Sequence, residues 1–358
     1  MTEPAASTQP SVLSAPRPLV VDIDHSLLCT DLFDETFVDG LRRQPLQTIL
    51  ALRSLRQGRA ALKAQLAGAS RLDVRALPYN RDVLACLADA RSQGRPVHLV
   101  SAADASLVQA VADHLGGFDG HHGSSAELNL KGEQKAQWLA QRFGARGFDY
   151  VGDARSDLRV WAQAAQIITV GLGSGLRRAV RRLAAAQASS VLHLSAPPGG
   201  LARWRPWLRL LRPRQWRAEL ILLLSTWGFG GFAASGLAAE QWLAVGAYWL
   251  FGLGSRVAAG LWYAQPHRLW RRSSGKSRNP LAEGELRLRT AAVLGTVLLG
   301  AGGLGVGLIG GWALLPLAVV HGSACIWSVA LDGRHRWLQR LSGLARGSVA
   351  ALAGLLLA

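Results

Sequence analysis

Six polar side chains in the first half of this 358-residue chain follow or flank short apolar segments: Asp22, Asp24, Ser101, Lys131, Asp153 and Asp157. A carboxylate can attack phosphorus and form an aspartyl-phosphate, and a second carboxylate two residues later can protonate the leaving oxygen and then activate water. A hydroxyl group and an ammonium group offset charge on the phosphoryl oxygens. Clustered carboxylates repel one another unless a hard cation such as Mg²⁺ neutralises them. The set therefore predicts phosphoryl transfer with Mg²⁺ as cofactor.

Each of these assignments has a structural alternative. The stretch from Pro18 to Leu28, PLVVDIDHSLL, is also typical of a strand that ends in solvated acids. Ser101 can be an ordinary hydroxyl at a strand end. Lys135 follows Lys131 by one helical turn, so Lys135 is the alternative for the lysine that faces the phosphate.

The elements that must position these residues alternate along the chain. Apolar runs predict strands at residues 19–23, 97–101, 148–151 and 167–170, and amphipathic segments predict helices at residues 81–94, 105–115, 131–143 and 157–165. This order predicts a mainly parallel, doubly wound α/β sheet. Open sheets of this kind bind ligands at the carboxyl ends of their strands, where Asp22 and Asp153 would lie.

The block from Asp31 to about Leu77 is predicted to be helical. Its apolar residues recur at spacings of three and four, at Leu46, Ile49, Leu50, Leu52 and Leu55, and it contains many arginines. Pro78 ends the block. It is inserted between the first and second strands, so residues 34–78 are expected to form a small helical cap over the sheet.

The motifs DIDHSL, a strand-final Ser101, Lys131-Gly132 and GDARSD resemble, in order and spacing, the four motifs of the haloacid-dehalogenase (HAD) phosphohydrolase superfamily. The resemblance covers residues 18 to 194. It implies that Asp22 is the nucleophile, Asp24 the general acid and base, and Ser101 and Lys131 the phosphate-binding residues. It also implies a Mg²⁺ site formed by Asp22, Asp24, Asp153 and Asp157.

One position departs from the HAD pattern. The family usually has Gly-Thr after the second aspartate, whereas this chain has His25-Ser26. Ser26 keeps the hydroxyl group, but His25 replaces the residue that lets the backbone turn freely. We expect the HAD fold, and phosphatase catalysis with it, to be retained despite this change.

Composition divides the chain into two parts. The formal net charge is +17, and after residue 200 acidic residues become scarce while apolar blocks alternate with Arg clusters. This pattern favours the cytoplasmic flanks of membrane helices over nucleic-acid binding, for which no reader motif is present. Residues 1–17 are small and polar, so we expect a disordered tail rather than a signal peptide.

Cysteine and histidine residues add no metal or disulfide site to this prediction. Cys29, Cys86 and Cys325 lie far apart and show no CxxC spacing. Adjacent histidines in a strand point to opposite faces, so we interpret His121-His122 as a solvated loop pair.

The second half predicts a membrane domain. Residues 199–217, in which Arg alternates with Trp and Leu, predict a helix at the membrane surface. Apolar blocks near the length of a span follow at residues 220–239, 242–263, 290–310 and 312–331, and a shorter fifth lies at 349–358. Arg-rich connections at residues 268–289 and 334–346 predict a multi-pass protein of the cell membrane whose N-terminal domain is cytoplasmic.

The segments LRPRQW (residues 211–216) and NPLAEGELRLRTA (residues 279–291) resemble UbiA-type prenyltransferases, in particular decaprenyl-phosphate phosphoribosyltransferase-like members, some of which carry an N-terminal HAD domain. Prenyl transfer in that family needs an aspartate-rich segment that holds Mg²⁺. No carboxylate lies between Glu240 and Glu283, and the chain ends before the family's full set of spans. Residues 218–358 are therefore expected to form a degenerate, truncated UbiA-like domain of four to five helices.

A basic cluster in this second half has two interpretations. Arg268, Arg271, Arg272, Lys276 and Arg278 are either a topology signal or contacts for a lipid phosphate.

The sequence as a whole predicts a membrane-anchored, Mg²⁺-dependent HAD-type phosphatase. Its partners would be a phosphorylated metabolite or lipid-linked phosphate and membrane lipids, with no nucleic acid. The alternatives are a UbiA-type prenyltransferase and a non-catalytic membrane scaffold.

Overall fold

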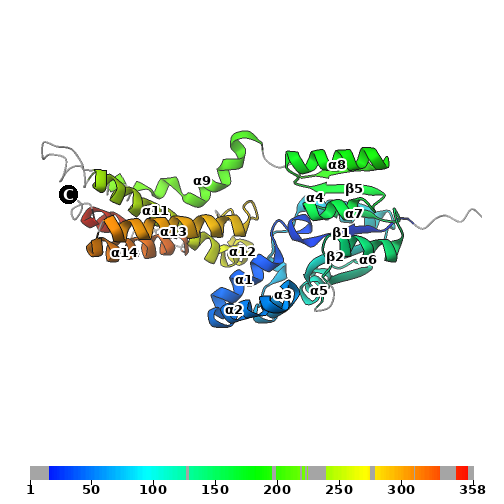
Figure 1. Cartoon of the computed structure of the whole chain (residues 1–358), viewed down its shortest axis with the longest axis horizontal. Coiled ribbons are helices and arrows are strands. Elements are labelled where there is room, and N and C mark those ends of the chain that lie inside the picture. The colour runs from blue at the N-terminus through cyan, green and yellow to red at the C-terminus, as the bar shows by residue number, and fades with distance from the viewer. Residues whose placement is uncertain are drawn as a thin grey trace, which may run out of the picture.

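The structure is a computed structural model that describes residues 16–125, 129–195, 199–217, 220, 221, 224, 239–274, 279–309, 311–330 and 344–353. An α/β part precedes residue 195, and a helical part follows residue 199 (Figure 1). The predicted tail lies almost entirely outside the described residues.

The α/β part contains a six-stranded sheet in the order β3-β2-β1-β4-β5-β6. Its strands are β1 (Leu19–Val21), β2 (Val97–Asp104), β3 (Gly120–Ser124), β4 (Asp149–Gly152), β5 (Gln166–Val170) and β6 (Ser190–Leu194). All five strand pairs are parallel. The predicted parallel α/β sheet is therefore confirmed.

Alternate residues of the short first strand enter two different cores. Leu19 and Val21 join the apolar cluster on one face of the sheet, and Val20 joins the cluster on the other. Because both faces are buried, the strand is a continuous apolar run rather than an alternating one. Such burial makes β1 the central, rigid support for the residues that follow it.

Helices cover both faces of the sheet. One core contains residues of α4 (Arg81–Ser92) and α5 (Ala105–Leu115), and the other contains residues of α6 (Glu133–Phe143), α7 (Leu158–Trp161) and α8 (Ser174–Gln187). The sheet is thus doubly wound, as the alternation of patterns predicts.

The cap is built from α1 (Leu32–Arg43), α2 (Pro45–Ala51), the 3₁₀ segment η2 (Leu52–Gln57), α3 (Arg59–Ala69) and the 3₁₀ turn η3 (Val74–Ala76). Two neighbouring segments connect it to the sheet. Leu28 and Tyr79 form an antiparallel bridge, and the N–H of Cys29 donates to the carbonyl of Pro78 at 2.8 Å. We call these two segments, residues 28–30 and 78–80, the hinge.

Three predictions about local structure need correction. His121 and His122 lie in strand β3, not in a loop, and the His122 ring stacks on Trp138 with centroids 4.5 Å apart. The helix expected at residues 157–165 is only the short α7, preceded by a 3₁₀ turn at residues 155–157. Strand β6 was missed because its sequence, SVLHL, is largely exposed at the edge of the sheet.

The helical part contains α9 (Arg205–Leu211), α11 (Ala239–Trp262), α12 (Ala264–Ser274), α13 (Leu288–Ile309) and α14 (Gly311–Ala330), and residues 344–353 are also helical. Helices α11 and α13 pack very closely. A Cβ at Gly302 would lie 2.4 Å from the backbone nitrogen of Phe251, so only glycine permits this approach.

One described helix, Leu288–Ile309, is long and apolar enough to cross a membrane; Leu314–Ala330 and Leu344–Ala353 are apolar but shorter. The predicted span at residues 220–239 lies mostly outside the described residues. The multi-pass arrangement therefore stays a prediction.

Candidate functional site

Two acids flank the point at which the order of the sheet reverses. The chain runs outward from β1 to β2 and β3, and then returns to the other side of β1 as β4. Asp22 follows β1 and Asp153 follows β4, and both strands are parallel neighbours. In open α/β sheets this switch point leaves a crevice at the carboxyl edge, which is the usual ligand site.

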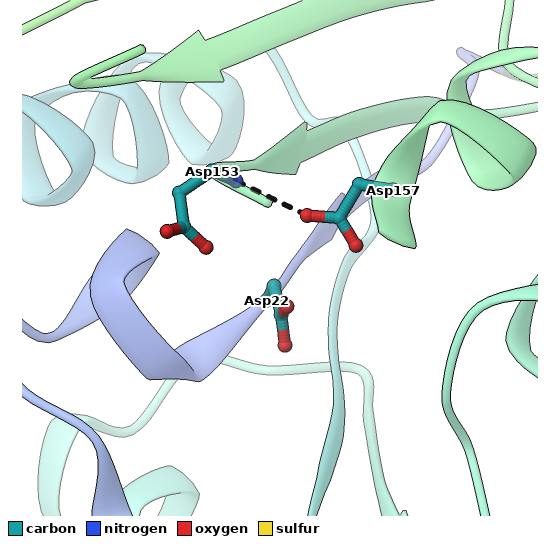
Figure 2. A group of neighbouring side chains, drawn as sticks. All are labelled: Asp22, Asp153 and Asp157. Atoms are coloured by element: carbon teal, nitrogen blue, oxygen red, sulfur yellow. Dashed lines mark hydrogen bonds between the residues drawn. The ribbon is translucent and has the colours of Figure 1, made fainter. Parts of the chain in front are cut away.

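Three predicted carboxylates meet there. One oxygen from each of Asp22, Asp153 and Asp157 lies within 4.8 Å of the others. Figure 2 shows these three side chains around a common space. Asp157 is fixed in place because its Oδ2 accepts hydrogen bonds from the backbone N–H of Asp153 (3.1 Å) and of Ala154 (3.0 Å). We call these three residues the acidic triad.

The acidic triad carries unbalanced negative charge. Burial, together with the charges of Asp157 and Asp22, raises the pKa of Asp153 to about 8. Burial and the charge of Asp22 also raise the pKa of Asp157 to about 6. The acidic triad offers only oxygen ligands, and a bound cation would offset the charge that burial disfavours on Asp153 and Asp157. Oxygen ligands of this kind suit Mg²⁺.

A buried lysine supplies part of that positive charge. Nζ of Lys135, on α6, lies 3.0 Å from Oδ1 of Asp22 and 3.0 Å from the hydroxyl oxygen of Tyr150. The Tyr150 hydroxyl donates to Oδ1 of Asp157 at 3.4 Å, so Tyr150 links Asp157 to Lys135, which in turn contacts Asp22. Lys131 is exposed one turn earlier. The geometry thus places the alternative lysine, Lys135, against Asp22.

Asp24 lies apart from the acidic triad. Its Oδ1 accepts a hydrogen bond from the backbone N–H of Leu32 at 2.8 Å, at the first turn of the cap. Burial raises the pKa of Asp24 to about 8, with further contributions from the charges of Asp31 and Asp22. Of the four predicted metal ligands, the structure therefore groups three, and it leaves Asp24 apart as a carboxyl group with a raised pKa.

His25 adopts the backbone conformation that its position in the motif demands. Its φ is +55°, in the left-handed region that favours glycine. The N–H of His25 donates to the carbonyl of Thr30 at 3.1 Å, which closes the turn between Asp24 and the cap. The turn is therefore closed with a non-glycine residue in the left-handed region, at a local strain of about 1–3 kcal/mol.

Ser101 lies within β2 and is fully buried. Its Oγ accepts a hydrogen bond from the N–H of Ala103 at 3.1 Å. In the register of the sheet Leu99 is opposite Val21, so Ser101 stands at the same sheet edge as Asp22. A phosphate contact of Ser101 stays a prediction.

The sequence motifs missed Lys63 on α3. Its Nζ donates to the carbonyl of Ala102 at the end of β2, and its charge acts on Asp24, Lys131 and Asp22. The chain contains only four lysines, and three of them, Lys63, Lys131 and Lys135, gather around this site. Lysine is rare in this chain and arginine is abundant, so the position of each lysine was the sequence signal that could have revealed Lys63.

A small pocket opens between sheet and cap beside Asp24. It is lined by Asp24, Leu32, Phe33, Thr36, Lys63, Ala103, Asp104 and Leu107. Its wall thus combines one acid of the site, one cap lysine and apolar groups.

The helical part also reaches the site. Nη2 of Arg287 lies 3.7 Å from Oδ2 of Asp153, and Arg289 pairs with Asp31 and Asp34 at the start of the cap. A Cβ at Gly284 would lie 2.5 Å from Cβ of Cys29, so this segment packs directly on the hinge.

The basic cluster, which is either a topology signal or a set of lipid-phosphate contacts, is only partly described. The guanidinium of Arg268 is buried against Glu35 of the cap. The side chains of Arg271 and Arg272, and residues Lys276 and Arg278, lie outside the described residues. A lipid-phosphate role for the cluster stays a prediction.

No family model matches the chain. Over 207 residues the chain is 35% identical to the uncharacterized protein y4nM of Sinorhizobium fredii (strain NBRC 101917 / NGR234), and the match covers 58% of this chain and 39% of that protein. The chain thus spans about two fifths of the length of the curated relative that it matches.

Solved structures show similarity over about half of the chain. A protein of unknown function from Bordetella pertussis Tohama I has a TM-score of 0.37 at 18% identity, covering 50% of this chain and 99% of that one. Phosphoserine phosphatase in its apo form has a TM-score of 0.36 at 14% identity, covering 51% and 95%. A probable phosphoserine phosphatase from Vibrio cholerae has a TM-score of 0.35 at 14% identity, covering 50% and 62%.

Proposed function

We propose that residues 18–195 form a HAD-type, Mg²⁺-dependent phosphatase that hydrolyses a phosphate monoester through an aspartyl-phosphate on Asp22. The observation that carries the proposal is the position of Asp22 at the switch point. One of its oxygens lies beside the buried Lys135, and it shares a space with Asp153 and Asp157. If Asp22 were only a solvated acid at the end of a strand, neither a buried lysine nor two further acids would be needed beside it.

In the first step an oxygen of Asp22 attacks phosphorus and the ester P–O bond breaks. Asp24 gives its proton to the leaving oxygen, and its pKa of about 8 keeps it protonated for this task near neutral pH. In the second step Asp24 accepts a proton from water while that water attacks phosphorus. The bond from phosphorus to Asp22 then breaks, and inorganic phosphate leaves.

The acidic triad would hold Mg²⁺, which when bound offsets negative charge on the phosphoryl oxygens. Lys135 orients Asp22 and contributes a second positive charge from within the protein. Lys63 closes the cap side of the site, where it faces Asp24 across the pocket. Arg287 approaches from the helical part and is 66% exposed, so it is free to contact a phosphoryl oxygen as well as Asp153.

The helical part is proposed to anchor this phosphatase in a membrane. Helix α13 has the length and composition of a span, and its large apolar residues Val293, Val297, Leu304 and Leu308 are between 60% and 83% exposed. Exposed apolar surface of this extent favours a lipid environment. Prenyl transfer is not favoured, because the acidic triad is the single group of three candidate ligands among the described residues.

The test is phosphate release from p-nitrophenyl phosphate by the full chain in detergent. We expect turnover with Mg²⁺, loss of turnover with EDTA, and loss in Asp22→Asn. Asp113→Asn, at an exposed position of α5, is the matched control and should retain activity. Turnover that is equal in Asp22→Asn and in the control would contradict the proposal.

A further inference from the structure

The second cap helix has its apolar residues on the wrong side for a protein in water. Leu46, Ile49, Leu50, Leu52 and Leu55, which we call the cap apolar face, are between 43% and 76% exposed. Ile49 and Leu50 follow Leu46 by three and four residues along α2, and Leu52 and Leu55 are three residues apart along η2, so they share one side of this segment. Five large aliphatic side chains on one exposed face form a patch rather than scattered surface residues.

The opposite side of the same segment is buried and consists of small residues. Thr48, Ala51 and Ser54 face the interior, and the hydroxyl groups of Thr48 and Ser54 donate to backbone carbonyls of Gln44 and Ala51. A helix that packs only against its own domain in water buries its large apolar residues and exposes its small polar ones. This segment does the reverse, so its leucines are placed for an apolar environment outside the domain.

The charge around the cap apolar face has a single sign. Between Asp39 and Asp73 the chain has no acidic residue, but it has six arginines and one lysine. Arg53 and Arg56 on this segment and Arg59 at the start of α3 are exposed, and no ion pair of theirs is found among the described residues. An apolar face flanked by unpaired arginines complements the interface of an anionic bilayer, in which acyl chains lie beneath phosphate groups.

The position of the cap agrees with such a surface. Arg289, at the start of the apolar helix α13, pairs through its Nε with Oδ1 of Asp34 on α1, at 2.5 Å. Figure 1 shows α1 and α2 beside the end of the helical bundle that carries α12. If α13 crosses a membrane, its first residues lie at the headgroup level, and the cap is attached to the protein at that level.

We propose that the cap apolar face is a membrane-surface contact, with its leucines among the acyl chains and Arg53, Arg56 and Arg59 at anionic headgroups. This inference rests on the proposed membrane position of α13. The cap would then be held on the bilayer while the sheet lies above it.

The test places a photo-crosslinker in the full chain, reconstituted in nanodiscs that contain either neutral or partly anionic phospholipid. Ile49→p-benzoylphenylalanine probes the cap apolar face, Val297→p-benzoylphenylalanine probes α13, and Leu192→p-benzoylphenylalanine on edge strand β6 is an exposed apolar control. We expect lipid adducts at positions 49 and 297 and none at position 192. In anionic discs, removing charge by Arg53→Gln or Arg56→Gln should lower the adduct yield at position 49 by about fivefold each.

The other outcomes are equally decisive. Lipid capture at position 297 without capture at position 49 overturns the inference and leaves the membrane position of α13 intact. Capture of a second chain instead of lipid at position 49 also overturns it and assigns the face to self-association. Absence of lipid at both positions overturns the membrane position together with the inference, while the phosphatase activity is tested separately.

Discussion

Arg268 of α12 donates to both carboxylate oxygens of Glu35 on cap helix α1, each at 2.7 Å, across 233 residues of sequence. Both side chains are buried, and Arg268 also donates to the carbonyls of Ala282 and Leu281. A bidentate pair whose donors and acceptors all have partners holds the two helices in one relative geometry. The helical part therefore holds the cap of the proposed phosphatase in a single position.

Breaking this pair should be strongly destabilising. Arg268→Met leaves the Glu35 carboxylate buried, with Thr30 and Gln265 as its remaining side-chain partners among the described residues. The expected loss is about 3–5 kcal/mol, or about 10 °C in the thermal midpoint of the full chain in detergent. Adding Glu35→Met should recover much of the loss, because no unpaired charge then remains. Equal midpoints for Arg268→Met and wild type would contradict a structural role.

An exposed pair gives the matched control for that substitution. Arg209 pairs with Glu285 between α9 and the segment before α13, and both side chains are partly exposed. Arg209→Ala should cost less than about 1 kcal/mol, because water replaces the lost contact.

The two candidate lysines can be separated by activity. Lys135→Met removes the ammonium group 3.0 Å from Asp22 and should lower kcat by about 10²–10³. Lys131→Met removes an exposed charge and should change KM by about tenfold or less. Steady-state kinetics on p-nitrophenyl phosphate decide between them. A larger loss in Lys131→Met would show that Lys131 is the catalytic lysine, as the motif comparison first implied.

Arg287 should contribute to substrate binding. Arg287→Ala removes a charged donor that lies 3.7 Å from Asp153, and we expect KM to rise about tenfold with a smaller change in kcat. Arg75→Ala, at a cap arginine of matching exposure, should leave both constants unchanged. Similar kinetics for the two variants would mean that the helical part does not contribute to the phosphate site.

The free energy of unfolding should depend on pH differently with and without Mg²⁺. Asp24 and Asp153 have folded pKa values near 8, above the value of about 4 in an unfolded chain, so the folded state binds more protons between these limits. The metal-free protein should therefore lose stability as pH rises from about 4 to 8. Mg²⁺ binds the ionised acids, so its stabilising effect should grow over the same range.

Thermal midpoints at about pH 6 and pH 9, with EDTA or Mg²⁺, check this prediction. Asp153→Asn should flatten the pH dependence in EDTA and reduce the effect of Mg²⁺. A Mg²⁺ effect that is larger at the lower pH would contradict the assignment of the acidic triad.

Much of the sheet and of the acidic triad could be predicted because local patterns specify them. The β-branched run before Asp22 is buried on both faces, and parallel strands bring their carboxyl ends to one edge. The choice between Lys131 and Lys135 could not be made from the sequence, since the pattern predicts one helix over both, whereas the helix begins at Glu133 and buries only Lys135. His121 and His122 were misjudged because strand β3, GHHGS, lacks apolar residues and is recognised only by pairing with β2.

Contacts between the two parts lay beyond sequence reasoning. Arg268, Arg287 and Arg289 appear in the sequence as an Arg-rich connection, which is typical of a cytoplasmic loop. Their partners Glu35, Asp153 and Asp34 are more than 130 residues away, and no local pattern specifies such pairing. The exposure of the cap apolar face could not be predicted either. Helical spacing shows that apolar residues share one side of a helix, but not whether another element covers that side.

The central claim is a covalent bond between phosphorus and Asp22. Asp24→Asn should still allow attack on p-nitrophenyl phosphate, whose leaving group needs little protonation, but should slow hydrolysis of the intermediate. After acid quench with Mg²⁺ present, mass spectrometry of the peptide that contains Asp22 should show an added phosphoryl group in Asp24→Asn and none in the double variant that also carries Asp22→Asn. Steady turnover in wild type, with no phosphoryl group on Asp22 in any variant, would contradict the account.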